Sequence, residues 1–248
     1  MPDELSRSVT DKVLALLGAF SHENPALTLT ELSKLTGLSL PTVHRRAAEL
    51  VEWGALERGP DRRYRVGLRL WEVATLAPRG HGLRDVALPF LQDLYDVTKQ
   101  RHVHLSVRNH LDVTFLERLR APNAPQAGIR SGGRFGTFAT GAGLVLLAHA
   151  PSDVQDEYLS SPLQRYTGKT VTDPGRLRSI LAGIRREGYS SSDRMVGEDV
   201  HCVGAPIYGP DATVVAAVSL CFRVGTHSVR EIAPQVRAAA RRISLALR

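Results

Sequence analysis

Residues 27–56 constrain the fold more than any other part of the chain. They read LTLTELSKLTGLSLPTVHRRAAELVEWGAL. Thr30 can cap a short helix that Gly37 can end, because glycine tolerates the left-handed conformation that often follows a helix. Ser39 can cap a second helix, with Pro41 in its first turn, where the missing N–H costs little. Two short helices joined by a tight glycine turn predict a helix-turn-helix.

The second of these helices is amphipathic. The residues that form its apolar stripe at helical spacing are Val43, Ala47, Leu50 and Val51. Thr42, Arg45 and Glu49 project from the opposite side, and His44 and Arg46 lie on the flanks. A helix that buries one stripe and offers Thr and Arg near its start can present these groups to base edges in a DNA major groove.

A basic hairpin follows the second helix. We predict short strands at Leu56–Glu57 and Tyr64–Val66 around a turn at residues 59–63, and this hairpin is the wing of a winged helix-turn-helix. The arginines of the wing can reach phosphates. The alternative is an ordinary solvated helix face beside a charged hairpin, but the order and spacing of the two features favour DNA binding. The predicted DNA-binding residues are Ser39, Pro41, Thr42, His44, Arg45, Arg46, Arg62, Arg63 and Arg65.

Composition narrows the class of protein without deciding it. A formal charge of +7 suits a nucleic-acid partner, yet residues 1–80 hold 11 Lys/Arg against 10 Asp/Glu, so placement matters more than net charge. No stretch is apolar enough to span a membrane and no signal peptide opens the chain, so we expect a cytoplasmic protein without a membrane partner. The two cysteines, Cys202 and Cys221, fit a reducing compartment and argue against structural zinc. We expect no cofactor, since Rossmann, P-loop and GxSxG motifs are absent.

The length of 248 residues predicts two domains. We place the DNA-binding domain at 1–67, a linker helix and hinge at 68–82, and a second domain at 83–248. In the second domain, alternating residues at 102–107 and apolar runs at 113–116, 200–207 and 214–222 predict an antiparallel sheet. Helices are expected at 83–100, 139–150, 173–187 and 228–247. The predicted fold class is therefore α+β.

The two late strands suggest a ligand site. If residues 209–212 form a four-residue turn, paired residues sum to 421, and Cys202 lies opposite Ser219. Because side chains alternate along a strand, Cys202, Ser219 and Cys221 then share one face of the sheet, unless a bulge changes the pairing. Gly141 opens an apolar helix whose free N–H groups favour a carboxylate.

The chain resembles the IclR-type transcription regulators. The resemblance is carried, in order, by four segments: LTLTELSKLTGLSLPTVHRRAAELVEWGALERGPDRRYRVGLRLWEVA, GRFGTFATGAGLVLLA, DPGRLRSILAGIRREGY and HCVGAPIYGPDATVVAAVSL. It implies a C-terminal GAF-like effector domain with flanking helices, dimers or tetramers on operator DNA, and control by a small organic ligand. Arg46 stands where the family usually has leucine, and Leu144 where it usually has lysine.

The resemblance also names the effector-binding residues. They are Gly141, Ala142, Cys202, Ser219 and Cys221, with Asp193 as the nearest candidate for the loop acid. We add Phe138 as an aromatic residue close to this site in the sequence. Cys221 stands where a second serine is usual, and Ser192 occupies the aligned position of the loop acid, with Asp193 beside it. Phe222 and Arg223 replace a Gly-Pro pair, which argues against a small keto acid and leaves an aromatic acid or amide open.

Two other interpretations remain. His102 and His104 share a strand face near His110, which suggests a metal site, but packed or solvated histidines are the more common arrangement. A GAF-like redox or hydrolytic enzyme could use Cys202 and Cys221 as a reactive pair, although an apolar hairpin would raise a thiol pKa. We therefore expect a binding protein rather than an enzyme.

Overall fold

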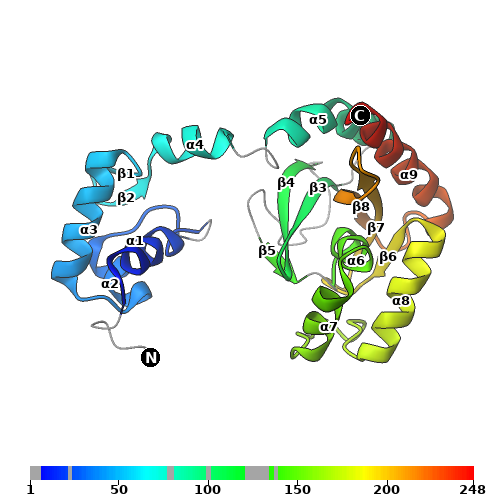
Figure 1. Ribbon diagram of the computed structural model, residues 1–248, viewed down its shortest axis with the longest axis horizontal. Coiled ribbons are helices and arrows are strands. Elements are labelled where there is room, and N and C mark those ends of the chain that lie inside the picture. The colour runs from blue at the N-terminus through cyan, green and yellow to red at the C-terminus, as the bar shows by residue number, and fades with distance from the viewer. Residues whose placement is uncertain (1–6, 22–23, 77–80, 99–101, 121–133, 137–138) are drawn as a thin grey trace. The chain divides into compact units, whose positions relative to one another are not determined.

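The chain folds into two compact units, residues 1–81 and 82–248 (Figure 1). The computed structural model describes residues 7–21, 24–76, 81–98, 102–120, 134–136 and 139–248. Each unit has its own hydrophobic core. The two units are therefore described separately.

The N-terminal unit is a helix-turn-helix followed by a hairpin. Its elements are α1 (Val9–Gly18), α2 (Leu29–Thr36), α3 (Leu40–Trp53), β1 (Leu56–Arg58), β2 (Tyr64–Val66) and α4 (Leu68–Thr75). β1 and β2 are antiparallel, with Leu56 opposite Val66. Leu16, Leu32, Val43 and Ala47 are fully buried where α1, α2 and α3 meet. The predicted winged helix-turn-helix is confirmed.

The start of α2 differs from the prediction. Thr28, not Thr30, caps the helix: its hydroxyl accepts from the N–H of Glu31, and the Glu31 carboxylate accepts from the N–H of Thr28. This reciprocal capping box satisfies two backbone donors at once, because position 31, three residues after Thr28, is a glutamate. Thr30 has Ser33 at the same spacing, which cannot complete such a box. Gly37 ends α2 with a φ of 70°, in the left-handed region that glycine favours.

The C-terminal unit is built around one six-stranded antiparallel sheet with the strand order β5-β4-β3-β8-β7-β6. The strands are β3 (His102–Asn109), β4 (Asp112–Arg120), β5 (Arg134–Gly136), β6 (Ser190–Asp193), β7 (Val200–Tyr208) and β8 (Val214–Arg223). The helices are α5 (His81–Thr98), α6 (Gly141–Ala148), α7 (Ser152–Ser160), α8 (Pro174–Glu187) and α9 (Val229–Ala246). The α+β class predicted from the sequence is confirmed.

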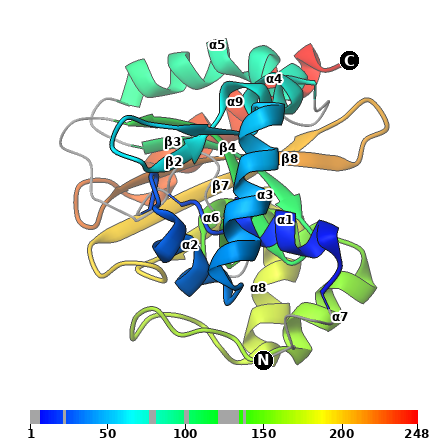
Figure 2. The same cartoon turned by 90° about the vertical axis from the view of Figure 1, so that its left-hand side faces the viewer.

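Helices cover both faces of the sheet. Figures 1 and 2 show α5 and α9 on one side and α6, α7 and α8 on the other. Val103, Leu220 and Phe222 pack towards α5 and α9, whereas Cys202 and Cys221 belong to the cluster that contains α6 and α8. We call the second side the α6 face.

The pairing of β7 with β8 corrects the predicted register. Cys202 lies opposite Cys221, and Gly204 lies opposite Ser219, so paired residues sum to 423 rather than 421. One residue of the difference arises in the turn, where Ala212 takes a φ of 60° and Gly209 pairs with Thr213. The other arises from the bulge next to Ile207. A shift of two keeps every side chain on its predicted face.

Candidate nucleic-acid interface and effector site

The N-terminal half of α3 presents polar side chains to solvent. His44 and Arg45 are exposed and Thr42 is half-buried, while Val43 between them is fully buried. Ser39 is the N-cap residue, but its hydroxyl donates to the Thr42 hydroxyl at 2.9 Å instead of capping the backbone. The start of the helix therefore keeps free backbone N–H groups that can bind phosphate. Pro41 lies exposed in this first turn.

Arg46 is placed differently from Arg45. Its guanidinium binds Glu49 at 2.6 Å, and only 12% of its side chain is exposed. In contrast, none of the carboxylates in the described segments lies within ion-pair distance of Arg45. Arg45 is thus the arginine of α3 that is available to a partner.

The wing holds two of its three candidate arginines in ion pairs. Arg65 binds Asp61 at 2.6 Å, and hydrogen bonds from Arg65 lower the pKa of Asp61 to about 2. Arg62 is exposed at the tip with a φ of 59°, and the described carboxylates leave its charge unpaired.

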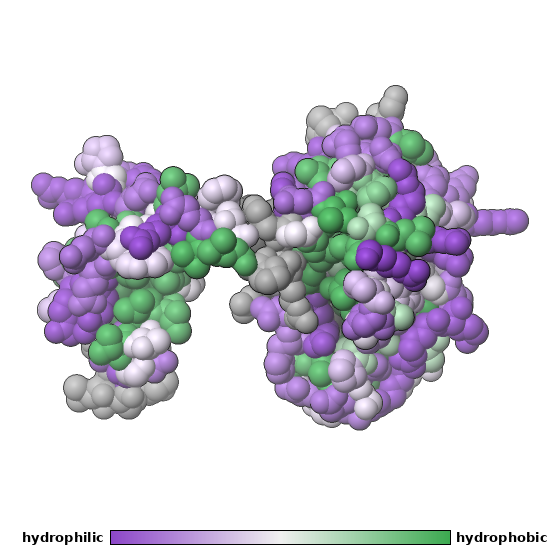
Figure 3. Space-filling view, turned by 45° about the horizontal axis from the view of Figure 1, so that its top comes forward, coloured by the Kyte–Doolittle hydropathy of each residue, from purple (hydrophilic) through white to green (hydrophobic). Residues whose placement is uncertain are grey.

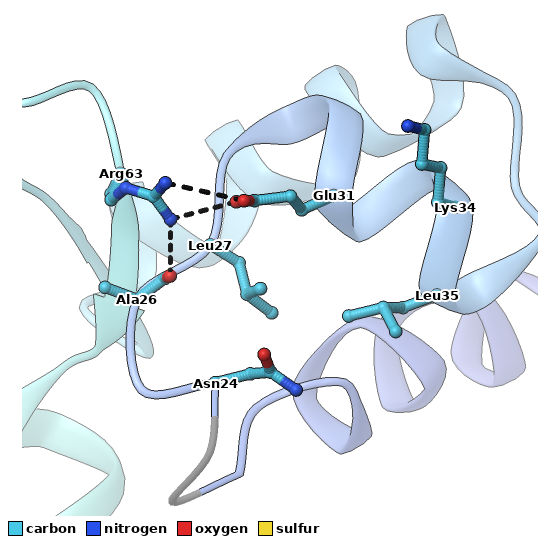
Figure 4. A pocket seen from close by; sticks show the side chains of 7 residues that line it. All are labelled: Asn24, Ala26, Leu27, Glu31, Lys34, Leu35 and Arg63. Atoms are coloured by element: carbon cyan, nitrogen blue, oxygen red, sulfur yellow. Dashed lines mark hydrogen bonds and ion pairs between the residues drawn. The ribbon is translucent and has the colours of Figure 1, made fainter.

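Arg63 joins the wing to the helix-turn-helix. Its guanidinium donates to the Glu31 carboxylate at 3.0 Å and to the carbonyl of Ala26 at 2.9 Å (Figure 4). It borders a pocket of about 320 Å³ that Leu27 and Leu35 also line. Because Glu31 is itself part of the capping box of α2, Arg63 braces the wing against that helix.

The effector-site candidates of the late hairpin share the α6 face. Cys202 and Cys221 are opposite each other, and Ser219 is two residues before Cys221 on the same side of β8. All three are at most 2% exposed. Gly141 and Ala142 open α6 directly above them and are buried as well.

The start of α6 rests on β7 with almost no space between. A Cβ atom added to Gly141 would lie 3.1 Å from the Cβ of Cys202, and one added to Gly204 would lie 2.6 Å from the carbonyl oxygen of Gly141. The hydroxyls of Ser190 and Ser192 on β6 donate to the carbonyls of Gly141 and Ala139, at 2.6 and 2.7 Å. These contacts fix the helix start against the sheet.

The two cysteines form a disulfide. Their Cα atoms are 4.1 Å apart, close to the roughly 4.5 Å of a non-hydrogen-bonded antiparallel pair. The sequence analysis expected a reducing compartment and placed Cys202 opposite Ser219, so it did not foresee this bond. The corrected register brings the two sulfurs together.

Strand β3 adds buried polar groups that the sequence analysis did not assign to the effector site. His102, His104 and Ser106 are each fully buried and pair with Cys221, Ser219 and Ala217 of β8. Burial lowers the pKa of His104 well below its ordinary value of 6.5, and the charges of His102 and Arg118 lower it further. His104 is therefore neutral. The alternation of residues 102–107 indicated that His102, His104 and Ser106 share a face of the sheet. Only the pairing of β3 with β8 shows that this is the α6 face.

Within the described segments, His104 Nε2 and Ser106 Oγ are buried without a hydrogen-bond partner. A buried polar group left unsatisfied costs roughly 1–3 kcal/mol. Native proteins satisfy nearly all such groups with protein, water or ligand. These two atoms are therefore available to a further polar group.

Two predicted effector residues do not join this cluster. Asp193 pairs with His201 on β7, so it faces away from Cys202, and it is bound by Arg194 at 2.9 Å. Ser192, opposite Cys202, instead lies on the α6 face, as Ser190 does. Phe138 lies outside the described residues.

Other classes of site find little support. The described part of the chain contains no group of three or more His, Cys, Asp or Glu side chains that could hold a metal ion. His110 is 3.9 Å from Glu157 and points away from the buried histidines into solvent, with 70% of its side chain exposed. The helices of the described residues include none that is long and apolar enough to cross a membrane.

Family models match both units. The IclR helix-turn-helix domain matches residues 9–60, and the bacterial transcriptional regulator IclR C-terminal domain matches residues 76–245. The chain belongs to the IclR family. It is accordingly an IclR-type transcription regulator, a DNA-binding protein that responds to a small-molecule effector.

Individual IclR relatives match most of the length of this chain. The crystal structure of an IclR homologue from Microbacterium hydrocarbonoxydans complexed with 4-hydroxybenzoate has a TM-score of 0.92 and 35% identity, covering 97% of this chain and 99% of that chain. XynR of Escherichia coli is 29% identical over 85% of this chain and 84% of its own length. BhcR of Paracoccus denitrificans is 28% identical over 96% and 86%. Both are HTH-type transcriptional regulators.

Proposed function

We propose that α3 enters the major groove of an operator and reads bases with Thr42, His44 and Arg45. These side chains lie on the solvent side of the helix, opposite the buried stripe. Arg62 at the wing tip contacts phosphate. The remaining predicted contacts have supporting roles, because their groups are already engaged inside the unit or lie beside the readers: Ser39, Pro41, Arg46, Arg63 and Arg65.

The effector in this proposal is a small aromatic carboxylate of the 4-hydroxybenzoate type, bound on the α6 face. The observation that supports it most strongly is the closeness of the IclR homologue crystallised with 4-hydroxybenzoate. The carboxylate lies near the start of α6, where Gly141 and Ala142 offer backbone N–H groups. Ser219 and the Cys202–Cys221 pair form the floor.

The protein acts by binding rather than by catalysis. A cysteine nucleophile requires a thiolate, and both sulfurs are held in the disulfide. Relatives over most of the chain are transcription regulators.

The functional assembly is a homodimer or a pair of dimers. Exposed apolar side chains cluster on and beside α4: Leu68, Trp71, Val73 and Leu76 are 50% or more exposed. Figure 3 shows hydrophobic colouring on the N-terminal unit where α4 lies. A second copy of the chain that covers this face removes apolar surface from water and places two recognition helices on successive major grooves.

The test of this function is DNA binding by the purified chain as a function of salt. We expect its own promoter region to bind far more tightly than a random duplex of equal length, with affinity falling steeply as salt rises because phosphate contacts release counterions. Equal affinity for both duplexes at every salt concentration contradicts the proposal. Sedimentation of the same samples checks the assembly, and a monomer at micromolar concentration with and without DNA contradicts the dimer.

A further inference from the structure

The buried polar side chains of β3 lie in a row that crosses the effector site. His104 is opposite Ser219, and Ser219 is in turn opposite Gly204, on which the start of α6 rests. Neighbouring strands lie about 4.8 Å apart, so His104 and Gly204 are separated by about 9–10 Å across the sheet. That span accommodates one aromatic ring with a polar group at each end.

The His104 ring offers an acceptor on its unpaired side. Nδ1 faces Cys221 Sγ at 4.0 Å, and a disulfide sulfur has no hydrogen to donate. In a neutral imidazole one nitrogen carries the hydrogen and the other accepts. The hydrogen is therefore assigned to Nδ1, and Nε2 presents a lone pair that no described residue uses.

The surroundings of this acceptor combine an apolar wall with the Arg118 side chain, which lies opposite His104 on β4. The ring of Phe115 contacts His104 edge-on, with centroids 5.3 Å apart. Phe115, Leu144 and Val145 belong to one buried cluster on the α6 face. The Ser106 hydroxyl lies two residues from His104 on the same side of β3, and it too has no partner in the described segments.

A carboxylate is not a partner for Nε2 itself. Its oxygen would face the lone pair of Nε2, and two acceptors cannot form a hydrogen bond. A ligand hydroxyl or N–H would instead donate to Nε2 and exchange a hydrogen bond with Ser106 Oγ.

We propose that His104 and Ser106 form the hydrogen-accepting end of the effector site, which selects an aromatic carboxylate that carries a hydroxyl or N–H group opposite its carboxylate. The inference rests on the proposed function for the position of the carboxylate. It adds the specificity-determining residues and the chemical class of the second ligand group.

The experiment compares three acids by calorimetry on the full chain: 4-hydroxybenzoate, benzoate and 4-methoxybenzoate. Wild type should bind 4-hydroxybenzoate roughly tenfold more tightly than the other two, because only that acid donates to the buried acceptor. His104→Phe should bind benzoate as wild type does and lose the preference for 4-hydroxybenzoate. His201→Phe is the matched control, since it makes the same change on the opposite face of the sheet and should keep the preference.

Ser106→Ala provides a second arm in case His104→Phe fails to fold. It removes one oxygen and should reduce the preference for 4-hydroxybenzoate by a few fold, leaving benzoate binding unchanged. Equal binding of all three acids to wild type, or a full preference retained in both variants, overturns the inference. Such a result means that water alone fills this end of the site.

Operator titration separates this failure from failure of the proposed function. If benzoate and 4-hydroxybenzoate bind equally and both change operator affinity, the effector function stands and the hydrogen-accepting end is wrong. If none of the three acids binds, the proposed effector class is contradicted together with the inference.

Discussion

The two units use polar side chains in opposite ways. The N-terminal unit exposes its candidate site on one helix and one hairpin, where charged groups face solvent or pair at the surface. The C-terminal unit buries histidine and serine side chains between strands, and the described residues offer no hydrogen-bond partner to His104 Nε2 or Ser106 Oγ. A surface for DNA can be read from one continuous segment, whereas a small-molecule site depends on pairing between strands more than 100 residues apart, such as His104 with Ser219.

The same contrast applies to packing. Exposed ion pairs such as Arg65 with Asp61 are screened by solvent and contribute little to stability, so the candidate DNA-binding surface should tolerate substitution. The candidate effector site at the start of α6 is closely packed, and small changes there should be costly.

The largest effect is expected at Gly204. In Gly204→Ala the new Cβ would lie 2.6 Å from the Gly141 carbonyl oxygen, and backbone on both sides has to move. Overpacking of this kind costs roughly 1–3 kcal/mol, which lowers the Tm of the C-terminal unit by several degrees. Thermal unfolding measures it, with Gly168→Ala as the control because nothing lies within 4 Å of its added Cβ. An unchanged Tm for Gly204→Ala would refute close packing at this helix start.

The next effect is on DNA sequence preference. Arg45→Ala removes the exposed arginine of α3 and should reduce discrimination between the operator and a variant operator by about 1–3 kcal/mol. Competition binding measures it. Arg176→Ala, which removes the same charge from an exposed position on α8, should leave discrimination intact. If the two variants behave alike, α3 is not the reading helix.

A smaller effect separates the two arginines of the wing. Arg62→Ala should weaken all duplexes alike and reduce the slope of log affinity against log salt by about 0.9, the contribution of one phosphate contact. From the sequence alone, phosphate contacts are expected of all the wing arginines, Arg63 included. Because Arg63 is bound to Glu31 and Ala26, Arg63→Ala should change the slope less than Arg62→Ala does. A larger change in slope for Arg63→Ala than for Arg62→Ala would show that Arg63 makes the phosphate contact.

The smallest effect concerns pH, and here the two units should again differ. Burial lowers the pKa values of both His104 and His201, so the unfolded chain binds protons that the folded C-terminal unit does not. Its free energy of unfolding should therefore be fully present above pH 6.5 and fall as pH decreases below that value. In the N-terminal unit the lowered pKa of Asp61, about 2, places the corresponding loss between pH 4 and 2. Unfolding curves between pH 7.5 and 2.0 check both ranges. His104→Phe should flatten the dependence of the C-terminal unit between pH 7.5 and 5.0, and an equally steep curve in that variant assigns the effect elsewhere.

Local signals predicted most of the helices. Asp173 and Gly188 bound α8 as expected, and Ser228 with Glu231 caps α9 although Pro234 lies inside that helix. Periodicity was less reliable where a helix packs on a twisted sheet. Helical spacing puts Val97 on one face of α5 with Phe90 and Leu94, but Val97 is 76% exposed and Thr98 is buried in its place.

The effector site was only partly predictable. Its face was correct for Cys202, Ser219 and Cys221 because an error of two residues preserves alternation. The disulfide could not be predicted, since it depends on the bulge next to Ile207. The position of His104 on the α6 face could not be predicted either, since it depends on the pairing of β3 with β8. Neither feature leaves a local pattern in the sequence.

The most direct test of the account is operator affinity with and without 4-hydroxybenzoate. The account predicts that the saturating acid changes the affinity of wild type by roughly 5- to 150-fold, the usual range of coupling between two sites. Gly141→Val should remove the response while operator binding persists, because its side chain would collide with Cys202. Gly168→Val, with open space around the added Cβ, should respond as wild type does. The same operator affinity for wild type with and without the acid, or an undiminished response in Gly141→Val, would contradict an effector site at the start of α6.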